Sequence, residues 1–300
     1  MNPKEQMELL FQQAKERRKQ YDHSDMAGKE LMISGYTEND IQVFVHHPRQ
    51  KCSESLPVYI NLHGGAWLAG DAVCMDTYCQ KLADEIPALV INLNYTKIDE
   101  KPFPYARDEL TGTVRYFIEN AERYGGDPKR ILTGGFSAGG QIAAAAALKL
   151  AQTDIRIQGN VLAYPVVNFD GGDVKELQFL NLFARVLFAD GENRESWMSP
   201  LMASDEQLKN LCPTVIAVCG KDPLSSDAVL YAQKLIRNGV EVCFRRFEGA
   251  LHGFIEENQP GYSEGKPTQT EEQKEYSRSA VSYIIHSIQM LCAQEQGDAI

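Results

Sequence analysis

The chain has 300 residues, of which 43% are hydrophobic, and its formal net charge is −11. A chain of this length can bury one large core, or a core with a small subdomain. The acidic balance excludes a nucleic-acid-binding role in our interpretation, because DNA and RNA favour basic surfaces. The sequence has no metal-ligand motif such as HExxH. We therefore expect neither a metal ion nor an organic cofactor.

Cysteine usage and the first residues of the chain predict a cytoplasmic protein. The seven cysteines are odd in number and lack CxxC spacing, which is typical of a reducing compartment. The N-terminal residues contain no apolar stretch of signal-peptide length, and no segment reaches the ~20 apolar residues that cross a bilayer. We expect no membrane association. The sequence leaves the oligomeric state open, with a homodimer among the options.

The first predicted elements are an amphipathic helix and a strand hairpin. Apolar residues recur at helical spacing from Met7 to Ala14. The runs "ELMISGY" and "DIQVFVHH" then alternate in polarity on either side of "TEN", which indicates two antiparallel strands. This hairpin should supply an antiparallel edge to whatever sheet follows.

Six short apolar runs then alternate with helical patterns. The runs are rich in Val, Ile and Leu, as strands buried on both faces require: "PVYINL", "ALVINLNY", "RILTGGF", "NVLAYPV", "TVIAVCG" and "VEVCFRRF". Helices are predicted at about 75–86, 106–124, 138–151, 226–238 and 271–291, the last with a capping box between Thr270 and Gln273. This alternation predicts an α/β fold, in which helices cover both faces of a mostly parallel, twisted sheet.

One segment, residues 168–199, interrupts the alternation. It has no strand pattern, but its run "LQFLNLFARVLF" is apolar on more than one side of a helix. Such a helix must be covered by protein or line a pocket. We interpret the segment as an insertion over the sheet. Together with about residues 1–28 it would form a small helical cap on a single domain, 1–300.

A serine between glycines, "GFSAG" at 135–139, lies where a predicted strand meets a predicted helix. That is the context of a nucleophile elbow, whose strained turn exposes the serine at the carboxyl edge of the sheet. The helix N-terminus adds positive potential for a developing anion. Glycines at such a junction also occur for packing alone, so the pentapeptide by itself leaves both interpretations of Ser137 open.

A serine hydroxyl needs a base, and in this architecture the base follows the serine in the chain. Of the six histidines, two follow Ser137, and His286 lies within the last predicted helix. His252, in the loop "EGALHGF" after a strand, is therefore the expected base. The strand "TVIAVCGKD" delivers Asp222 as the expected acid, although a helix N-cap would also explain that position. Asp227 lies inside the next helix and is better explained as first-turn charge.

A further loop, "NLHGGAW", ends another predicted strand. Its small residues allow backbone N–H groups to approach a substrate closely. Such donors stabilise the negative oxygen of a tetrahedral intermediate. The loop should lie at the same sheet edge as Ser137.

These motifs resemble the hormone-sensitive-lipase-like branch of the α/β-hydrolases, a family of carboxylesterases. The similarity covers about residues 57–256 and rests on "HGGAW", "NYTKIDEKPFP", "GGDPKRILTGGFSAGGQ", "SPL", "CGKDPLSSD" and "LHGF". It implies the α/β-hydrolase fold, a cap built from an N-terminal segment and an insertion, and an oxyanion hole formed by the N–H groups of Gly65, Ala66 and Ala138. Three features depart from the family pattern: Ala66 for the third glycine, Phe136 for Asp or Glu, and "YTKIDE" for "YRLAPE".

The leading hypothesis is a serine carboxylesterase that hydrolyses small-molecule esters with short acyl chains, acetyl to hexanoyl, through an acyl-enzyme. The expected pocket residues are Phe136, Trp67, Phe183 and Leu187. Two alternatives stay open. The loop "HGGAW" also resembles that of arylformamidases, which cleave an N-formyl amide with the same triad. The second alternative is a non-catalytic ligand-binding relative, but such receptors lack the histidine that this chain has at His252.

Overall fold

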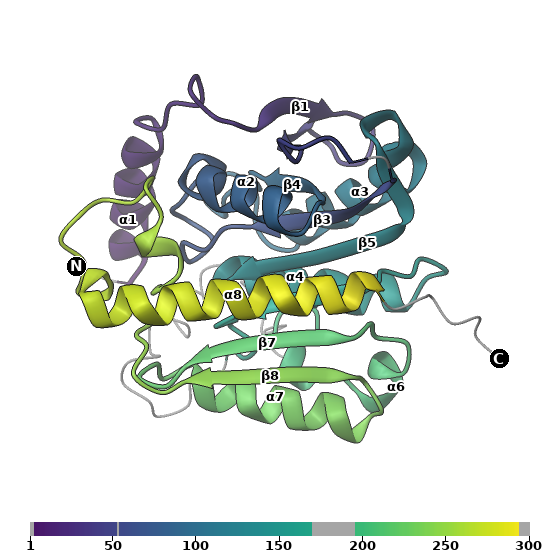
Figure 1. The fold of residues 1–300 in the computed structure, drawn as a ribbon. Coiled ribbons are helices and arrows are strands. Elements are labelled where there is room, and N and C mark those ends of the chain that lie inside the picture. The colour runs from purple at the N-terminus through teal and green to yellow at the C-terminus, as the bar shows by residue number, and fades with distance from the viewer. Residues whose placement is uncertain (1–2, 53, 170–195, 294–300) are drawn as a thin grey trace.

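The computed structural model describes residues 3–52, 54–169 and 196–293 (Figure 1). The eight strands form one sheet in the order β1-β2-β4-β3-β5-β6-β7-β8. Strand β2 pairs antiparallel with β1 and β4, and all other neighbours are parallel. The strands are β1 (Lys29–Ile33), β2 (Ile41–His46), β3 (Leu56–Leu62), β4 (Leu89–Leu93), β5 (Gly126–Phe136), β6 (Gly159–Ala163), β7 (Thr214–Cys219) and β8 (Val242–Phe247).

The helices among the described residues lie around this sheet. The α-helices are α1 (Pro3–Arg18), α2 (Asp76–Glu85), α3 (Tyr105–Asn120), α4 (Ala138–Ala151), α6 (Asp205–Leu208), α7 (Ser225–Arg237) and α8 (Glu271–Ala293). Short 3₁₀ turns are η1 (Ala72–Met75), η2 (Ala121–Tyr124), η4 (Pro200–Met202), η5 (Glu256–Asn258) and η6 (Pro267–Gln269).

Alternate residues of the central strands supply two hydrophobic cores. On β3, Val58 and Ile60 face a core that includes apolar residues of α3, α4 and α7. Tyr59, between them, faces a second core with α2 and α8. Because side chains alternate across a strand, nearly continuous apolar runs are needed to fill both cores. The predicted α/β-hydrolase architecture, with its antiparallel edge, is confirmed.

The sequence predicted helix positions closely, but one cap differs. Helix α4 has its predicted limits, whereas the pattern at 106–124 divides into α3 and η2. At the start of α8, the Thr270 hydroxyl accepts the Gln273 N–H at 3.3 Å, as a capping box requires. The Gln273 side chain does not complete the box. It bonds instead to the backbone of Gly249 and Leu251, in the loop before His252.

The N-terminal helix α1 contacts the loops that follow β3 and β4. Its Met7 and Ala14 are buried in the core. The Arg18 guanidinium donates to the Leu68 carbonyl at 2.6 Å and to the Asp99 carboxylate at 2.5 Å. The N-terminal part of the predicted cap therefore contacts the body of the molecule. Phe183 and Leu187, from the predicted insertion, lie outside the described residues.

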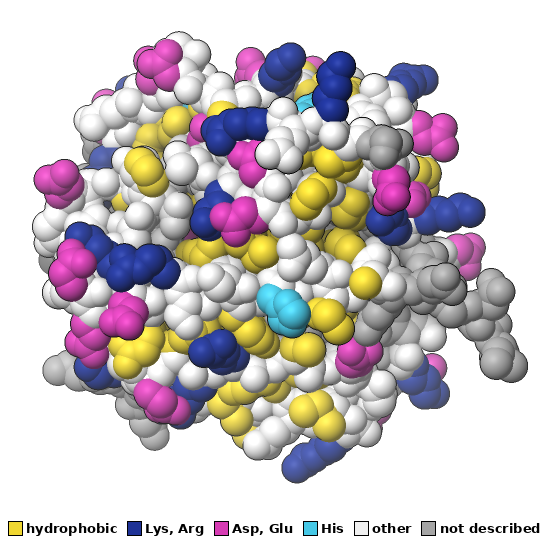
Figure 2. Space-filling view, in the orientation of Figure 1, with side chains coloured by type: hydrophobic (Ala, Val, Ile, Leu, Met, Phe, Trp, Pro, Cys, Tyr) yellow, Lys and Arg dark blue, Asp and Glu magenta, His cyan; other side chains and the backbone are white. Residues whose placement is uncertain are grey.

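The face that carries α8 has acidic and basic side chains interspersed with small apolar patches (Figure 2). No single sign of charge dominates this face. Among the described helices, none combines the length and the apolar composition that crossing a membrane requires.

Candidate active site

Ser137 occupies a strained turn between β5 and α4. Its φ of 50° and ψ of −111° lie outside the regions that L-residues favour, a conformation that costs about 1–3 kcal/mol and occurs mainly at functional sites. The glycines beside it are required by close packing. A Cβ on Gly135 would lie 2.5 Å from the backbone of Gly139, and one on Gly139 would lie 2.4 Å from the His63 carbonyl oxygen.

A continuous chain of hydrogen bonds joins Ser137, His252 and Asp222. Ser137 Oγ lies 2.9 Å from His252 Nε2, and His252 Nδ1 lies 2.6 Å from Asp222 Oδ2. The three residues follow strands β5, β8 and β7, whose carboxyl ends meet at this edge. The Asp222 side chain is only 2% exposed. Its second oxygen accepts the Leu224 N–H at 3.0 Å, so Asp222 both orients the histidine and caps the turn before α7.

The environment of His252 stabilises its protonated form. The protein atoms around the ring oppose the charge, but the hydrogen bond and negative charge of Asp222 outweigh them and raise the pKa of His252 above its ordinary value. The His252 side chain remains 38% exposed, because one edge of the ring lies in the cavity beside Ser137. An imidazole held this way can accept a proton from Ser137 and return it to a leaving group.

The loop after β3, residues 63–67, carries the expected oxyanion donors, and we call it the oxyanion loop. Gly65, Ala66 and Trp67 have φ values of 120°, 52° and 60°. Gly65 and Ala66 line the cavity that contains Ser137. Ala138 is the first residue of α4, where a backbone N–H has no partner within the helix. Gly65 and Ala66 therefore line the same cavity as Ser137, and Ala138 follows the serine directly in the chain.

His63 anchors this loop from the buried side. Its Nδ1 lies 2.6 Å from the Gly64 carbonyl oxygen, and its ring stacks on Tyr95 at 4.4 Å. Burial and the nearby charge of Lys97 lower the pKa of His63 to about 3. The ring is therefore neutral near pH 7, and Nδ1 can donate its single proton to the carbonyl.

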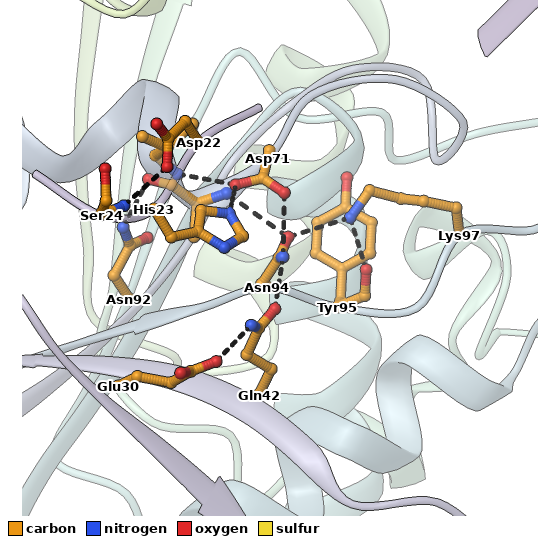
Figure 3. A network of polar contacts seen from close by, with 12 residues as sticks. Asp22, His23, Ser24, Glu30, Gln42, Asp71, Asn92, Asn94, Tyr95 and Lys97 are labelled. Atoms are coloured by element: carbon orange, nitrogen blue, oxygen red, sulfur yellow. Dashed lines mark hydrogen bonds and ion pairs between the residues drawn. The ribbon is translucent and has the colours of Figure 1, made fainter. Parts of the chain in front are cut away.

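A polar network joins the segment after β4 to the N-terminal segment (Figure 3). Asp71 lies at its centre, within 2.7 Å of His23 Nε2, and it accepts the Asn94 side-chain amide at 3.0 Å. The buried Lys97 ammonium donates to the Tyr95 carbonyl at 2.5 Å, and burial lowers the pKa of Lys97 to about 8. The network ties residues before β1 to the segment after β4, where the Tyr95 ring contacts the oxyanion loop at His63.

A cavity of about 1150 Å³ contains the serine and histidine side chains. Its lining includes the apolar side chains of Trp67, Val166 and Leu224 and, from the N-terminal segment, Arg17, Arg18, Gln20 and Tyr21. Trp67 is among the lining residues, and its indole N–H donates to Gln141 Oε1 at 2.9 Å.

Phe136 does not line the cavity, contrary to our expectation. Its ring is 1% exposed and lies in the second core, 5.2 Å from Tyr78 and 5.9 Å from Tyr164. Phe136 is the last residue of β5, where neighbouring side chains point to opposite faces of the sheet. The Phe136 side chain therefore lies on the face of the sheet that points away from the cavity.

Sequence reasoning missed a buried carboxylate at the site. Glu256 is 4% exposed, lines the cavity, and accepts the Gly64 N–H at 2.7 Å. In the sequence it is one of two adjacent glutamates after "LHGF", and such a pair is typical of a solvated turn. Its partner lies 192 residues away, so no local pattern could have revealed the contact. Among the described residues, no group of three or more His, Cys, Asp or Glu side chains is placed to hold a metal ion.

The fold and the hydrogen-bonded Ser137, His252 and Asp222 define the class of protein, a hydrolase with α/β-hydrolase architecture. Residues 59–256 match a family model described as the alpha/beta hydrolase fold. AB hydrolase superfamily protein C1039.03 from Schizosaccharomyces pombe is 30% identical over 213 residues, which cover 65% of this chain and 62% of that relative. Esterase LipI from Mycobacterium tuberculosis is 30% identical over 228 residues, 72% of this chain and 69% of the relative.

A solved structure supports the same assignment. The esterase from Pyrobaculum calidifontis superposes with a TM-score of 0.77 at 26% identity, covering 98% of this chain and 95% of that one. The chain therefore belongs to the α/β-hydrolases, in their hormone-sensitive-lipase-like branch.

Proposed function

We propose that the protein hydrolyses small-molecule carboxylic esters with short acyl groups, acetyl to hexanoyl, through an acyl-enzyme on Ser137. The observation that carries this proposal is the unbroken hydrogen-bond chain from Ser137 through His252 to Asp222, in a cavity lined by Gly65 and Ala66. The relatives named as esterases support the same bond type.

The reaction follows from this arrangement. Ser137 Oγ attacks the ester carbonyl while His252 Nε2 accepts its proton, and Asp222 stabilises the resulting imidazolium. The carbonyl oxygen becomes negative and binds the backbone N–H groups of Gly65, Ala66 and Ala138. His252 then donates the proton to the departing alkoxide, which leaves as the alcohol. A water molecule, deprotonated by His252, attacks the acyl-enzyme; the bond to Ser137 Oγ breaks, the acid is released, and His252 returns the proton to Ser137 Oγ.

The chemistry of the cavity supports a short acyl group. Apolar side chains near the serine can receive a few methylenes, each contributing up to ~0.8 kcal/mol. The same lining also includes the polar side chains of Arg18 and Gln20, and an alkyl chain that desolvates such groups is disfavoured. We also propose that residues 1–28 and 168–199 form the cap. Arg18 and Tyr21 already line the cavity from the N-terminal part of that segment.

The test is a series of p-nitrophenyl esters of increasing acyl length on the purified protein. The value of kcat/KM should peak at about two to six acyl carbons and fall steeply by about ten, because a misplaced carbonyl costs up to about a hundredfold in rate. An optimum at about twelve carbons or more would contradict the short-chain proposal. Turnover of N-formylkynurenine above every ester would favour the arylformamidase alternative. Failure of a fluorophosphonate to label Ser137 would favour a non-catalytic binding protein.

A further inference from the structure

We propose that Glu256 is a positioning residue that holds the oxyanion loop in place relative to the loop that carries His252. This inference deepens the proposed function and rests on it. Glu256 begins η5, four residues after His252. Its side chain reaches from that segment to the backbone of Gly64, immediately before the expected oxyanion donors.

The carboxylate of Glu256 joins three separate segments. Oε1 accepts the Gly64 N–H at 2.7 Å and the Tyr262 hydroxyl at 3.1 Å, and Oε2 accepts the Tyr164 hydroxyl at 3.3 Å. A buried carboxylate that receives three donors is well satisfied, because hydrogen bonds to a charged acceptor are stronger than those between neutral groups. Gly64 follows β3, Tyr164 follows β6, and Glu256 follows β8, so one side chain connects the ends of three strands.

The contact at Gly64 leaves no room for a Cβ while the Glu256 carboxylate keeps its position. A Cβ on Gly64 would lie 2.6 Å from Glu256 Oε2 and 3.0 Å from Oε1. The carboxylate therefore packs directly against the Gly64 backbone. This explains the first glycine of "HGGA" by packing against Glu256, a role separate from that of the donors that follow it.

Glu256 and His63 together hold the two peptides on either side of the Gly64 Cα, and the second of these peptides carries the Gly65 N–H. The Gly64 N–H is held by Glu256, and the Gly64 carbonyl accepts from His63 Nδ1 at 2.6 Å. In a trans peptide the carbonyl and the following N–H point in opposite directions. With the Gly64 carbonyl directed toward His63, the Gly65 N–H is directed away from it. Rotation of this peptide would move the donor, and an oxyanion donor is worth about 10²–10³ in kcat.

Glu256 also acts on the histidine side of the site. The Tyr164 ring that donates to its carboxylate lies edge-on to His252, with centroids 5.1 Å apart. The groups that face His252 are Ser137 and Tyr164, together with three carboxylates, Asp222, Glu256 and Glu257. All three carboxylates favour the imidazolium and raise the pKa of His252, Asp222 most strongly. Loss of the Glu256 charge should therefore lower the pKa of His252.

The experiment compares Glu256→Gln and Glu256→Ala with Glu248→Gln as the matched control. Glu248 lies in the loop before His252, but its side chain is 75% exposed and paired with Arg246. For each protein, kcat and KM for p-nitrophenyl acetate, the pH profile of kcat/KM, the fluorophosphonate labelling rate of Ser137 and the melting temperature are measured. For Glu248→Gln, kcat, KM and the labelling rate should stay within about twofold of the values for the unmodified protein.

Glu256→Gln should lower kcat about tenfold, with KM changed less than about threefold, because the amide keeps the shape but weakens the bond to Gly64. The acid limb of its pH profile of kcat/KM should move to lower pH, because the pKa of His252 falls when the Glu256 charge is lost. Glu256→Ala should lower kcat about 10²–10³-fold, as loss of an oxyanion donor does. If Glu256→Ala does not fold, Glu256→Gln alone decides.

Two results would overturn the inference. One is a Glu256→Gln variant with kcat and labelling rate within about twofold of the unmodified protein. The other is a loss of activity that only follows a loss of folded protein, with the acid limb unmoved. Failure of the proposed function is distinguishable from both. A protein that hydrolyses no ester contradicts the esterase proposal, whereas the labelling rates of Ser137 still compare the Glu256 variants directly.

Discussion

His252 determines the pH dependence expected of the reaction. The base must be neutral to accept the proton of Ser137, and Asp222 raises the pKa of His252 above about 6.5. Activity should therefore be low at acidic pH and rise as pH passes through this raised pKa. The measurement is kcat/KM for p-nitrophenyl acetate between about pH 5 and 9, with the midpoint expected above about 6.5.

The Asp222→Asn variant is the control for this pH profile. It removes the charge that raises the pKa, and it should also lower kcat by about 10⁴ because the imidazole loses its orienting acceptor. A flat profile in the unmodified protein across this range would contradict the assignment of His252 as the base.

Chain order, combined with position after a predicted strand, selected three residues that the fold brings within hydrogen-bond distance. Ser137 was identifiable by its glycines, and His252 and Asp222 by their places after strands. Phe136 was misjudged, since sequence proximity to the nucleophile does not reveal which face of the sheet a side chain fills. The contact of Glu256 with Gly64 could not be predicted from the sequence, because it depends on how β3 and β8 are placed in the folded sheet.

At the scale of elements, helix α8 holds the histidine loop through Gln273. Its side chain accepts the Leu251 N–H at 2.9 Å and donates to the Gly249 carbonyl at 2.8 Å. Gln273→Ala would leave two backbone groups without these bonds, at a cost of about 1–3 kcal/mol in the free energy of unfolding. Because the loop carries His252, kcat should fall as well. Chemical denaturation and esterase kinetics measure the two effects.

Gln289→Ala on the same helix is the matched control. Gln289 donates to the Glu85 carbonyl at 2.9 Å from an exposed position, so its loss should change stability by no more than about 0.5 kcal/mol. Equal effects of the two variants would contradict a special role for Gln273.

Helix α1 should contribute to substrate binding through Arg18. The side chain is 12% exposed and pairs with Asp99, itself 5% exposed, while also donating to Leu68 just after the oxyanion loop. Arg18→Ala should lower kcat/KM about tenfold, because the wall of the cavity and the adjoining loop lose their anchor. Lys19→Ala is the control, since Lys19 is 61% exposed and pairs with Glu16. An Arg18→Ala variant with kinetics like those of Lys19→Ala would contradict this role for the helix.

The periodicity of individual elements predicted most helices and strands, because burial on one or two faces leaves a repeating apolar pattern. Contacts between different elements leave no repeating pattern in the sequence, so they could not be predicted in this way. The Gln273 side chain turns from its own helix to the histidine loop, and Arg18 reaches Asp99, 81 residues away. The spacing of Thr270 and Gln273 matched a capping box, but the bond to a distant loop was the one formed.

At the scale of the molecule, alternating strands and helices predicted the class of fold but not the order of the strands. The order places β3 between β4 and β5, beside the strand that leads to Ser137. As a result the oxyanion loop after β3 lies next to the serine after β5. Asp222 and His252 reach the site from β7 and β8, on the other side of β5 (Figure 1). The site is therefore a product of strand order, which chain order alone does not specify.

The central claim is that Ser137 forms an acyl-enzyme, and trapping that species tests it most directly. The protein is mixed with p-nitrophenyl acetate, quenched in acid within the first turnover, digested and analysed by mass spectrometry. We predict one acetyl group on the peptide that contains Ser137, absent in Ser137→Ala, whose kcat should be lower by about four to six orders of magnitude. Near-normal turnover by Ser137→Ala, or acetyl groups on another residue in its place, would contradict the account.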